Sequence, residues 1–499
     1  MGVIARQSIK GALANYLGVA IGFVTTFFVV TRMLTTEEVG LTRVMVDAAT
    51  LFACLAQLGS SSSVVRFFPH FKEGRGIFGL SLLVPLAGFL LFGLAFLLFH
   101  EQITATYVER SPLLADYLYM LPAVTLFMLY MTVFETNASV LMRITVPKMV
   151  REVGVKVMTL VAYLLYGYRV VDLDGFVWIF CGSYGIAMLL DFFYLVKIGG
   201  GLRMFRIERG SLNRDLLGQM LRYTLLMTVT ILAGNVPLMS SLFLGAKTGL
   251  ALTGVYTIAF YIANVVEVPY RSLGAISRPV IATAVKEGNW AEVNRLGRQV
   301  SLHQLLVSTL IFYVIWINLD ALFAVIPNGA DYRGGAGVVL ILGLAKVLNS
   351  SLSIGTDVLN YSRYYALSLL LAAVLTVGAI LLNIRLIEFW GIDGAAAATL
   401  FSYALYFLLL LSFIGWRLKV SIFSAGQLKV LAIMGAGLGL NWLWTNYVTP
   451  LIATGSMASL LTDAALKTLV LTAVVVAVTL TWRVSPTVNR MVKKTSHIQ

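Results

Sequence analysis

Residues 76–99 read GIFGLSLLVPLAGFLLFGLAFLLF and contain no charged side chain. A helix of this length rises about 36 Å, which is enough to cross a hydrocarbon core of about 30 Å. Thirteen further stretches of similar character fill most of the chain. The whole sequence is 59% hydrophobic and 12% charged, with a mean hydropathy of +0.87. An ordinary soluble domain is nearer half apolar and a quarter charged, so the composition predicts a membrane protein.

The fourteen stretches are predicted to be transmembrane helices. Lipid offers no partner to backbone N–H and C=O groups, so a spanning segment forms its hydrogen bonds within itself. The runs are continuously apolar, which excludes the alternating pattern of barrel strands. The sequence therefore predicts an all-α membrane protein. The predicted spans are 10–32, 43–66, 76–99, 113–141, 150–168, 175–198, 217–244, 254–283, 302–326, 334–360, 364–385, 394–416, 428–447 and 463–482.

The charges between the spans predict the orientation. When alternate loops are assigned to opposite sides, 27 of the 37 Lys and Arg residues fall on one side and 8 on the other. Lys and Arg remain on the cytoplasmic side of membrane proteins, so both termini are predicted to be cytoplasmic. The net charge of +14 is thus mainly a topology signal. Nucleic-acid binding is disfavoured because the charge is scattered over short loops.

An internal repeat predicts two related halves. Gly40 precedes the second span, which leads to Lys-Glu-Gly at 72–74; Gly254 opens the eighth span, which leads to Lys-Glu-Gly at 286–288. The offset is 214 residues in both cases. Six helices per half give both halves the same orientation, so the repeats would be parallel and related by a pseudo-two-fold axis along the membrane normal.

The predicted organisation has four parts. Residues 1–198 form an N-terminal six-helix lobe, and the glycine-rich basic segment 199–216 is a cytoplasmic linker. Residues 217–418 form a C-terminal six-helix lobe. Residues 419–499 supply two additional transmembrane helices and a basic cytoplasmic tail. Residues 287–298 carry Trp290, Val293 and Leu296 among charges, which indicates either a short amphipathic surface helix or a solvated connector.

Ionisable residues inside the spans are the candidate functional groups, because a charge in lipid costs about 2.5–3.5 kcal/mol on insertion scales and usually faces a cavity or a partner. Eleven side chains are candidates. They are Asp47, Glu135, Asp191, Glu267, Arg271 and Lys346, with Arg32, Arg43, Arg66, Arg222 and Asp357 nearer the span ends.

Two acid–base pairs have a four-residue spacing that places both members on one helical face. They are Arg43 with Asp47 on the second span and Glu267 with Arg271 on the eighth. Each pair either neutralises itself structurally or lines a polar cavity, where arginine would bind phosphate oxygens. The acids would then tune the site or carry a coupling proton or sodium ion. Lys346 on the tenth span has no such neighbour and is expected to face a wet cavity.

For the remaining candidates a structural role is an alternative to a functional one. Asp191 and Glu135 lie towards the predicted cytoplasmic ends of their spans, and Asp191 could pair with Lys197. Arg32 and Arg66 could simply reach to lipid headgroups.

The sequence contains no phosphate-binding Gly-x-x-x-x-Gly-Lys-Ser/Thr loop, no His-Glu-x-x-His pair and no Gly-x-Ser-x-Gly elbow. The four histidines are scattered, and Cys54 and Cys181 both lie within predicted spans. No catalytic site, metal site or resident cofactor is therefore expected. A membrane enzyme such as a glycan polymerase or ligase is a competing hypothesis, but it would need larger outer loops than these.

Several segments resemble bacterial polysaccharide exporters. RMLTTEEVG at 32–40 resembles their R-x-L-x-x-x-x-x-G signature, and RFFP at 66–69 ends the second span in a similar way. Three segments in and after the eighth span also resemble these exporters: EVP at 267–269, RP at 278–279 and KEG at 286–288. Over essentially its whole length the chain resembles the O-antigen-type (Wzx) flippases of the multidrug/oligosaccharidyl-lipid/polysaccharide exporter superfamily.

The resemblance implies two lobes in a V shape around a cationic central cavity. It also implies a monomer of the bacterial inner membrane that carries undecaprenyl-pyrophosphate-linked glycans outward by alternating access. Membrane lipids and a polysaccharide polymerase would be partners. The residues that would line the cavity and bind the diphosphate are Arg43, Arg271, Lys346, Arg32 and Arg66. The residues that would couple transport to an ion (H⁺ or Na⁺), or pair with these charges, are Asp47, Glu267, Asp191 and Glu135.

Two alternatives belong to the same superfamily. Lipid II flippases carry an Arg-Asp pair in the middle of the first span and paired arginines in the second. This chain has Thr25 and Thr26 in the first span and Leu51, Phe52 and Ala53 in the second. These departures favour an O-antigen or capsule repeat unit as cargo. A cation-coupled multidrug antiporter would have a net acidic cavity and usually twelve helices.

Overall fold

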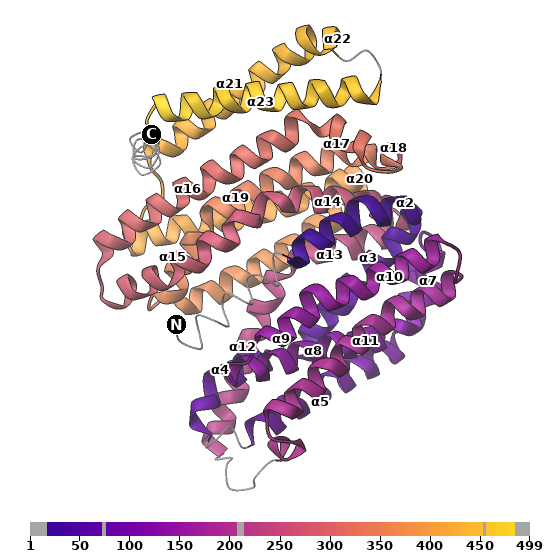
Figure 1. Ribbon diagram of the computed structural model, residues 1–499. Coiled ribbons are helices and arrows are strands. Elements are labelled where there is room, and N and C mark those ends of the chain that lie inside the picture. The colour runs from indigo at the N-terminus through magenta and orange to yellow at the C-terminus, as the bar shows by residue number, and fades with distance from the viewer. Residues whose placement is uncertain (1–16, 72–75, 207–213, 453–455, 485–499) are drawn as a thin grey trace. The chain divides into compact units, whose positions relative to one another are not determined.

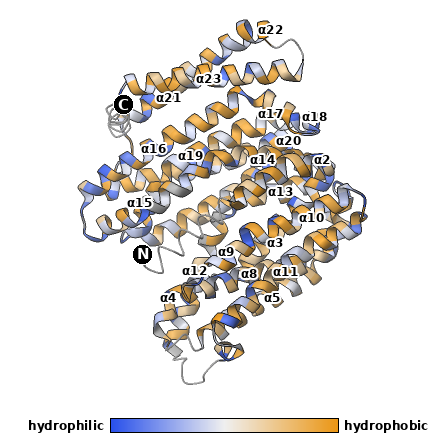
Figure 2. Ribbon diagram, viewed as in Figure 1, coloured by the Kyte–Doolittle hydropathy of each residue, from blue (hydrophilic) through white to orange (hydrophobic). Residues whose placement is uncertain are grey.

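The computed structural model describes residues 17–71, 76–206, 214–452 and 456–484, and all the regular secondary structure of these residues is helical (Figure 1). Ten helices in the described part are long and apolar enough to cross a membrane by length and composition. Hydrophobic residues run along most of each helix (Figure 2). The chain is a multi-pass membrane protein, and fourteen as the number of spans stays a prediction.

The chain divides into two compact units, Met1–Thr257 and Ile258–Gln499. The division falls inside helix α14 (Leu250–Asn264). The boundaries predicted from the sequence, at 198, 216 and 418, separate repeated groups of helices, whereas this division separates groups of residues that contact one another. They stay a prediction.

The first unit contains one apolar helical segment, Leu17–Met33, followed by the helices of the predicted second to seventh spans. Helix α3 packs against α5, α8, α12 and α13, and α11 packs against α8 and α10. The helices are α3 (Thr36–Ala56), α4 (Ser60–Phe67), α5 (Ile77–Leu98), α6 (His100–Val108), α7 (Pro112–Tyr117), α8 (Leu121–Val140), α9 (Thr145–Met149), η5 (Val150–Gly154), α10 (Val155–Gly167), α11 (Leu173–Ile198), α12 (Arg214–Gly234) and α13 (Val236–Lys247).

The second unit contains the remaining helices, among which α19 packs against α15, α16 and α20, and α21 and α23 pack against each other and against α16. Figure 1 shows α21 and α23 side by side. The elements are η7 (Val265–Glu267), α15 (Val268–Lys286), α16 (Trp290–Ile317), α17 (Leu319–Val325), α18 (Gly329–Tyr332), α19 (Ala336–Tyr361), α20 (Tyr365–Arg417), α21 (Ala425–Leu443), η9 (Trp444–Val448), α22 (Thr449–Ile452) and α23 (Met457–Thr481).

Several spans predicted as continuous helices are interrupted, among them the second, seventh and eighth. The second span breaks between α3 and α4, where Gly59 has a φ of +71° that a side chain would make costly. The seventh span breaks before α13, which carries a proline at its start, and the eighth contains the 3₁₀ turn η7 followed by Pro269. Proline is tolerated in the first turn of a helix because that N–H has no partner there.

Helix α20 joins the predicted eleventh and twelfth spans. A straight helix of its 53 residues would be about 80 Å long, far beyond the thickness of a bilayer. The break is at Gly391, whose backbone angles (φ 54°, ψ −127°) are not helical. This position lies between the two predicted spans, so the chain turns where the sequence predicted a loop.

Residues 287–298 form neither of the two predicted structures. Helix α16 begins at Trp290 and continues to Ile317, so this segment is the first part of a long helix. Asn289 caps it by accepting a hydrogen bond from the Glu292 N–H at 3.1 Å. The apolar and charged side chains that suggested a surface helix therefore extend the ninth span beyond its predicted start.

Two glycines bring α3 and α14 into direct backbone contact. A Cβ at Gly40 would lie 2.0 Å from the Leu250 carbonyl oxygen, and a Cβ at Gly254 would lie 1.9 Å from the Thr36 carbonyl oxygen. Gly40 and Gly254 are 214 residues apart, and so are Thr36 and Leu250. The two contacts are thus reciprocal under the offset of the repeat, as in a self-complementary interface.

We predict that Gly254→Ala destabilises the protein because its methyl group would push the Thr36 carbonyl away. Overpacking of this kind costs about 1–3 kcal/mol, and a lower thermal unfolding temperature of the purified protein would report it. Gly378→Ala is the matched control, since nothing lies within 4 Å of a Cβ at that helical position. An equal unfolding temperature for both variants would contradict the close contact.

Candidate functional site

A buried ion pair lies in the second unit. The Lys346 ammonium on α19 is 3.1 Å from Oε2 of Glu267, and Asn349 Nδ2 donates to the other carboxylate oxygen at 2.8 Å. Lys346 also lies 5.3 Å from the centre of the Phe260 ring. Lys346 is 4% exposed and Glu267 is 8% exposed. Both carboxylate oxygens are therefore held by α19, and the charge of the lysine is balanced inside the protein.

The expectation that Lys346 has no neighbouring charge is wrong. Its partner, Glu267, is 79 residues earlier in the chain and belongs to the 3₁₀ turn η7 rather than to a continuous helix. The backbone of Arg271 lies in α15, but its side chain lies outside the described residues. Pairing between Glu267 and Arg271 therefore stays a prediction.

The pairing expected on the second span is present in the first unit. Arg43 Nε is 2.5 Å from Asp47 Oδ2, one helical turn further along α3. Ser241 on α13 donates to the same carboxylate oxygen at 2.6 Å. Both charged side chains are buried. Helix α3 begins with a capping box in which Thr35 and Glu38 exchange hydrogen bonds, so this pair sits two to three turns from a well-defined helix start.

A third polar cluster joins α8, η5 and α11 in the first unit. Arg151 Nε is 3.1 Å from Glu135 Oε2, and its Nη2 donates to Thr132 Oγ1 at 2.7 Å. Asp191 on α11 is buried and interacts electrostatically with Arg151 and Glu135. One of its carboxylate oxygens, Oδ1, is buried and accepts no hydrogen bond from the described residues. The basic residue with which Asp191 interacts electrostatically is Arg151 rather than the suggested Lys197.

Arg32 and Arg66 are both exposed, in contrast to Arg43 and Lys346. Arg32 lies in the last turn of α2 (Thr31–Met33). The Arg66 guanidinium on α4 stacks 4.4 Å from the centre of the Tyr223 ring of α12. An exposed guanidinium on an aromatic ring at a helix end fits the headgroup reading of this residue.

Sequence reasoning missed four partners. Ser241 and Thr132 are uncharged and carry no signal of their own. Asn349 follows Lys346 by three residues and so shares its helical face, which is a usable signal. Arg151 is one of the 27 basic residues assigned to the cytoplasmic side, and it lies at the start of the fifth predicted span. A further pair joins Arg278 to the candidate Asp357 at 3.3 Å, with Tyr270 accepting from Arg278 at 2.8 Å.

These clusters already contain buried cations that are neutralised by carboxylates, so they are suited to binding an anion. A buried cation held by a carboxylate remains charged, because removing one partner would leave the other uncompensated. An incoming phosphate can replace or share the carboxylate, and planar guanidinium groups suit two-point contact with phosphate oxygens. Lysine offers a compact charge with three donors, of which Glu267 takes one.

No family model and no curated protein matches this sequence. Among solved structures, a lipid II flippase MurJ in an inward closed conformation is similar, with a TM-score of 0.72 and 12% identity over 94% of this chain and 98% of that chain. The fold of this chain is similar to that of this flippase. An inward-facing MATE multidrug transporter matches with a TM-score of 0.62 and 16% identity, over 80% of this chain and 94% of that chain.

A third similar structure is a MOP-superfamily transporter from Pyrococcus furiosus, described as having a binding pocket of reverse polarity. Its TM-score is 0.53, with 17% identity over 84% of this chain and 95% of that chain. These neighbours are named as transporters or flippases and not as enzymes, in agreement with the sequence-based expectation. At such identities the likeness establishes the fold alone.

We predict that Lys346→Met alone destabilises the protein by about 3–5 kcal/mol, because it leaves the Glu267 carboxylate buried and unpaired. The double variant Glu267→Gln/Lys346→Met removes both charges and is expected to recover most of the loss. Thermal unfolding in detergent measures both. Arg333→Ala is the control, because its pair with Asp320 is exposed and contributes about 1 kcal/mol or less. A double variant no more stable than Lys346→Met would contradict the pairing.

Proposed function

We propose that this protein flips an undecaprenyl-pyrophosphate-linked oligosaccharide, an O-antigen or other surface polysaccharide repeat unit, across the bacterial inner membrane by alternating access. The observation that carries the proposal is the buried cation Lys346, held by an acid within a MOP fold. The buried Arg43 on α3 is a second such cation. The sequence motifs at 32–40 and 66–69 support the same family of cargo.

The diphosphate is the proposed point of recognition. Arg43 in the first unit, and Lys346 and Arg271 in the second, are each proposed as a phosphate-binding cation within its own unit, since cations in a low-dielectric site bind phosphate strongly. Asp47 and Glu267 would keep Arg43 and Lys346 charged while no cargo is bound. Arg32 and Arg66, being exposed, would attract the anionic headgroup at the membrane surface.

The alternatives are weighed by length and by chemistry. The lipid II flippase covers 94% of this chain, whereas the two MATE and MOP transporters cover 80% and 84%. That difference supports a lipid-linked cargo over a drug. Lipid II itself is disfavoured by the absence of its Arg-Asp pair, since Thr25 and Thr26 occupy those positions.

The remaining parts of the proposal follow from topology and cargo. The basic loops support cytoplasmic termini. We propose a monomer that hands its product to a polysaccharide polymerase on the outer side, with membrane lipids as its surroundings.

We predict that the stabilised double variant Glu267→Gln/Lys346→Met loses flipping although it folds, because the diphosphate would lose a cation. Flipping is measured as surface glycan in a strain that lacks its own flippase, with membrane insertion checked in parallel. The charge swap Glu267→Lys/Lys346→Glu keeps the pair and is the matched comparison. Normal glycan in the neutral double variant would reduce Lys346 to a structural role.

Asp191 is the proposed carrier of the coupling ion. Asp47 and Glu267 are each bound to a cation, and Glu135 contacts Arg151 at 3.1 Å. Asp191 instead has a buried oxygen without a hydrogen bond, which a proton or sodium ion would satisfy. Arg151 would sense the change in charge, since it interacts with both acids.

We predict that Asp191→Asn makes transport in proteoliposomes insensitive to imposed proton and sodium gradients. The neutral amide has no negative charge with which to bind a proton or a sodium ion. Asp320→Asn is the control, because Asp320 lies on the exposed surface. If the unaltered protein already ignores both gradients, Asp191 has no coupling role. If Asp191→Asn responds like the unaltered protein, another acid carries the ion.

A further inference from the structure

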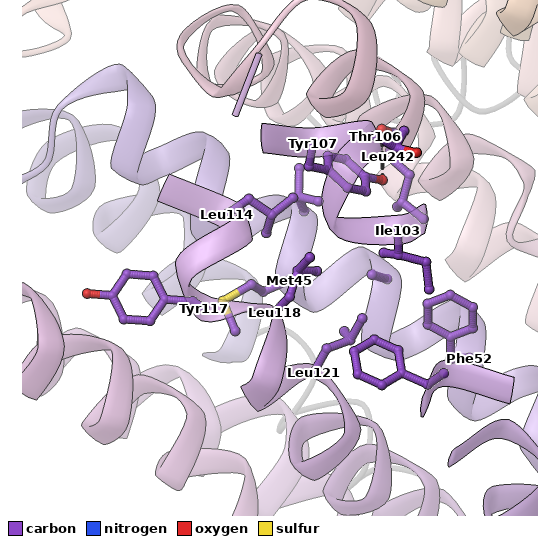
Figure 3. Close-up of a pocket in the computed structure, with 13 residues that line it drawn as sticks. Met45, Phe52, Ile103, Thr106, Tyr107, Leu114, Tyr117, Leu118, Leu121 and Leu242 are labelled. Carbon is purple, nitrogen blue, oxygen red and sulfur yellow. Dashed lines mark hydrogen bonds between the residues drawn. The ribbon is translucent and has the colours of Figure 1, made fainter. Parts of the chain in front are cut away.

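An apolar pocket of about 210 Å³ lies within the first unit, between α3, α5, α6, α7, α8 and α13 (Figure 3). Met45, Phe52, Leu118 and Leu121 form much of its wall, and no charged side chain lines it. Ile103 and Thr106 of α6 are partly or fully exposed at its edge, so the pocket is accessible from that side. None of the charged clusters described above contributes to it.

The hydroxyl groups in the wall are already engaged with the protein. Thr106 donates to the Gln102 carbonyl at 2.8 Å, and Tyr107 donates to the Leu242 carbonyl at 3.3 Å. The Tyr117 hydroxyl bonds to Asp174 and points away from the other labelled side chains (Figure 3). Burial raises the pKa of the Tyr107 phenol to about 12, so its proton remains available for the Leu242 carbonyl. The pocket therefore presents ring faces and alkyl groups.

Water is a poor occupant of such a space. A buried water needs two to four polar partners, and cavities lined by apolar side chains stay dry while accepting apolar ligands. A space left empty would also deprive its lining of dispersion contacts. The pocket is thus suited to a hydrocarbon guest.

The surroundings supply one kind of guest. Helix α5 contributes Phe96 to the wall, and on another face of the same helix Leu90, Leu94 and Leu97 are 56–74% exposed. In a membrane these leucines contact lipid chains. A 150 Å³ cavity accepts benzene, so by proportion this pocket holds about eight carbon atoms. That size fits the end of a chain rather than a whole lipid.

We propose that this pocket is a lipid site that binds the end of a phospholipid acyl chain beside α6. The site is separate from the proposed cargo site and does not depend on the identity of the cargo. Bound chains replace missing packing between α3, α6 and α13, so lipid stabilises this part of the first unit.

The test uses the full-length protein in vesicles of phosphatidylglycerol that carries a photoreactive diazirine near the acyl terminus. After illumination, mass spectrometry is expected to find adducts on α3 and α8 peptides that contain Met45 and Leu121. Thr106→Trp places a large ring at the exposed edge and should reduce these adducts by about tenfold, because a filled pocket has no room for a chain. Ala48→Leu, which fills the pocket from α3, should act in the same direction.

Two controls decide the result. Leu94→Trp adds the same ring on the exposed face of α5 and should leave the pocket adducts unchanged, and Thr106→Ala should also leave them unchanged. Adducts confined to exposed α5 residues, or adducts unaffected by both filling variants, would overturn the proposal. So would labelling of the pocket by a photoreactive undecaprenyl phosphate that excess phosphatidylglycerol cannot displace, since the occupant would then be the isoprenoid chain.

Discussion

A charge within a membrane must be balanced by the protein, and this constraint governs the interior of both units. An unbalanced lysine or acid at membrane depth costs several kcal/mol, so Lys346 meets Glu267 and Arg43 meets Asp47. The Lys346–Glu267 pair also fixes the rotation of α19 about its axis, because an apolar face would tolerate many rotations that the ion pair excludes. Arg43 and Asp47 share helix α3, so its rotation is restricted instead by the hydrogen bond from Ser241 of α13. Asn349 donates a hydrogen bond to Glu267, and Ser241 donates one to Asp47. Both bonds restrict how the helices can rotate. The same side chains that hold the helices therefore form the candidate sites.

The positions of the helices follow closely from hydropathy, because the hydrophobic thickness sets how long an apolar run must be. Within the described residues each predicted span falls on helical segments, although the eleventh and twelfth spans share the single helix α20. The interruptions were beyond reach, because a run of apolar residues scores alike whether or not it bends. Gly59 and Pro269 are ordinary members of such runs, and their effect depends on neighbouring helices. The start of α16 at Trp290 was missed because its first turns carry charge and lie beyond the apolar stretch.

The sites divide along a similar line. Pairs four residues apart on one helix can be predicted from spacing alone, and Arg43 with Asp47 is such a pair. The partner of Lys346 is on another helix, and one sequence carries no information about which acid it would be. The cluster of Arg151, Glu135 and Asp191 was hidden for a further reason. An arginine at the start of a span can set the orientation of the protein and can also belong to a binding site. Because Arg151 fits the first role, its position offered no reason to assign it the second.

The reciprocal approach of Gly40 and Gly254 has a consequence for the history of the chain. An ancestral protein of half this length could have paired with a second copy of itself, and one glycine per copy would then have satisfied both contacts. Fusion of two such genes would turn that single requirement into two separate codons. Each would face its own selection, because a side chain in either half strikes a main-chain oxygen that no mutation can remove.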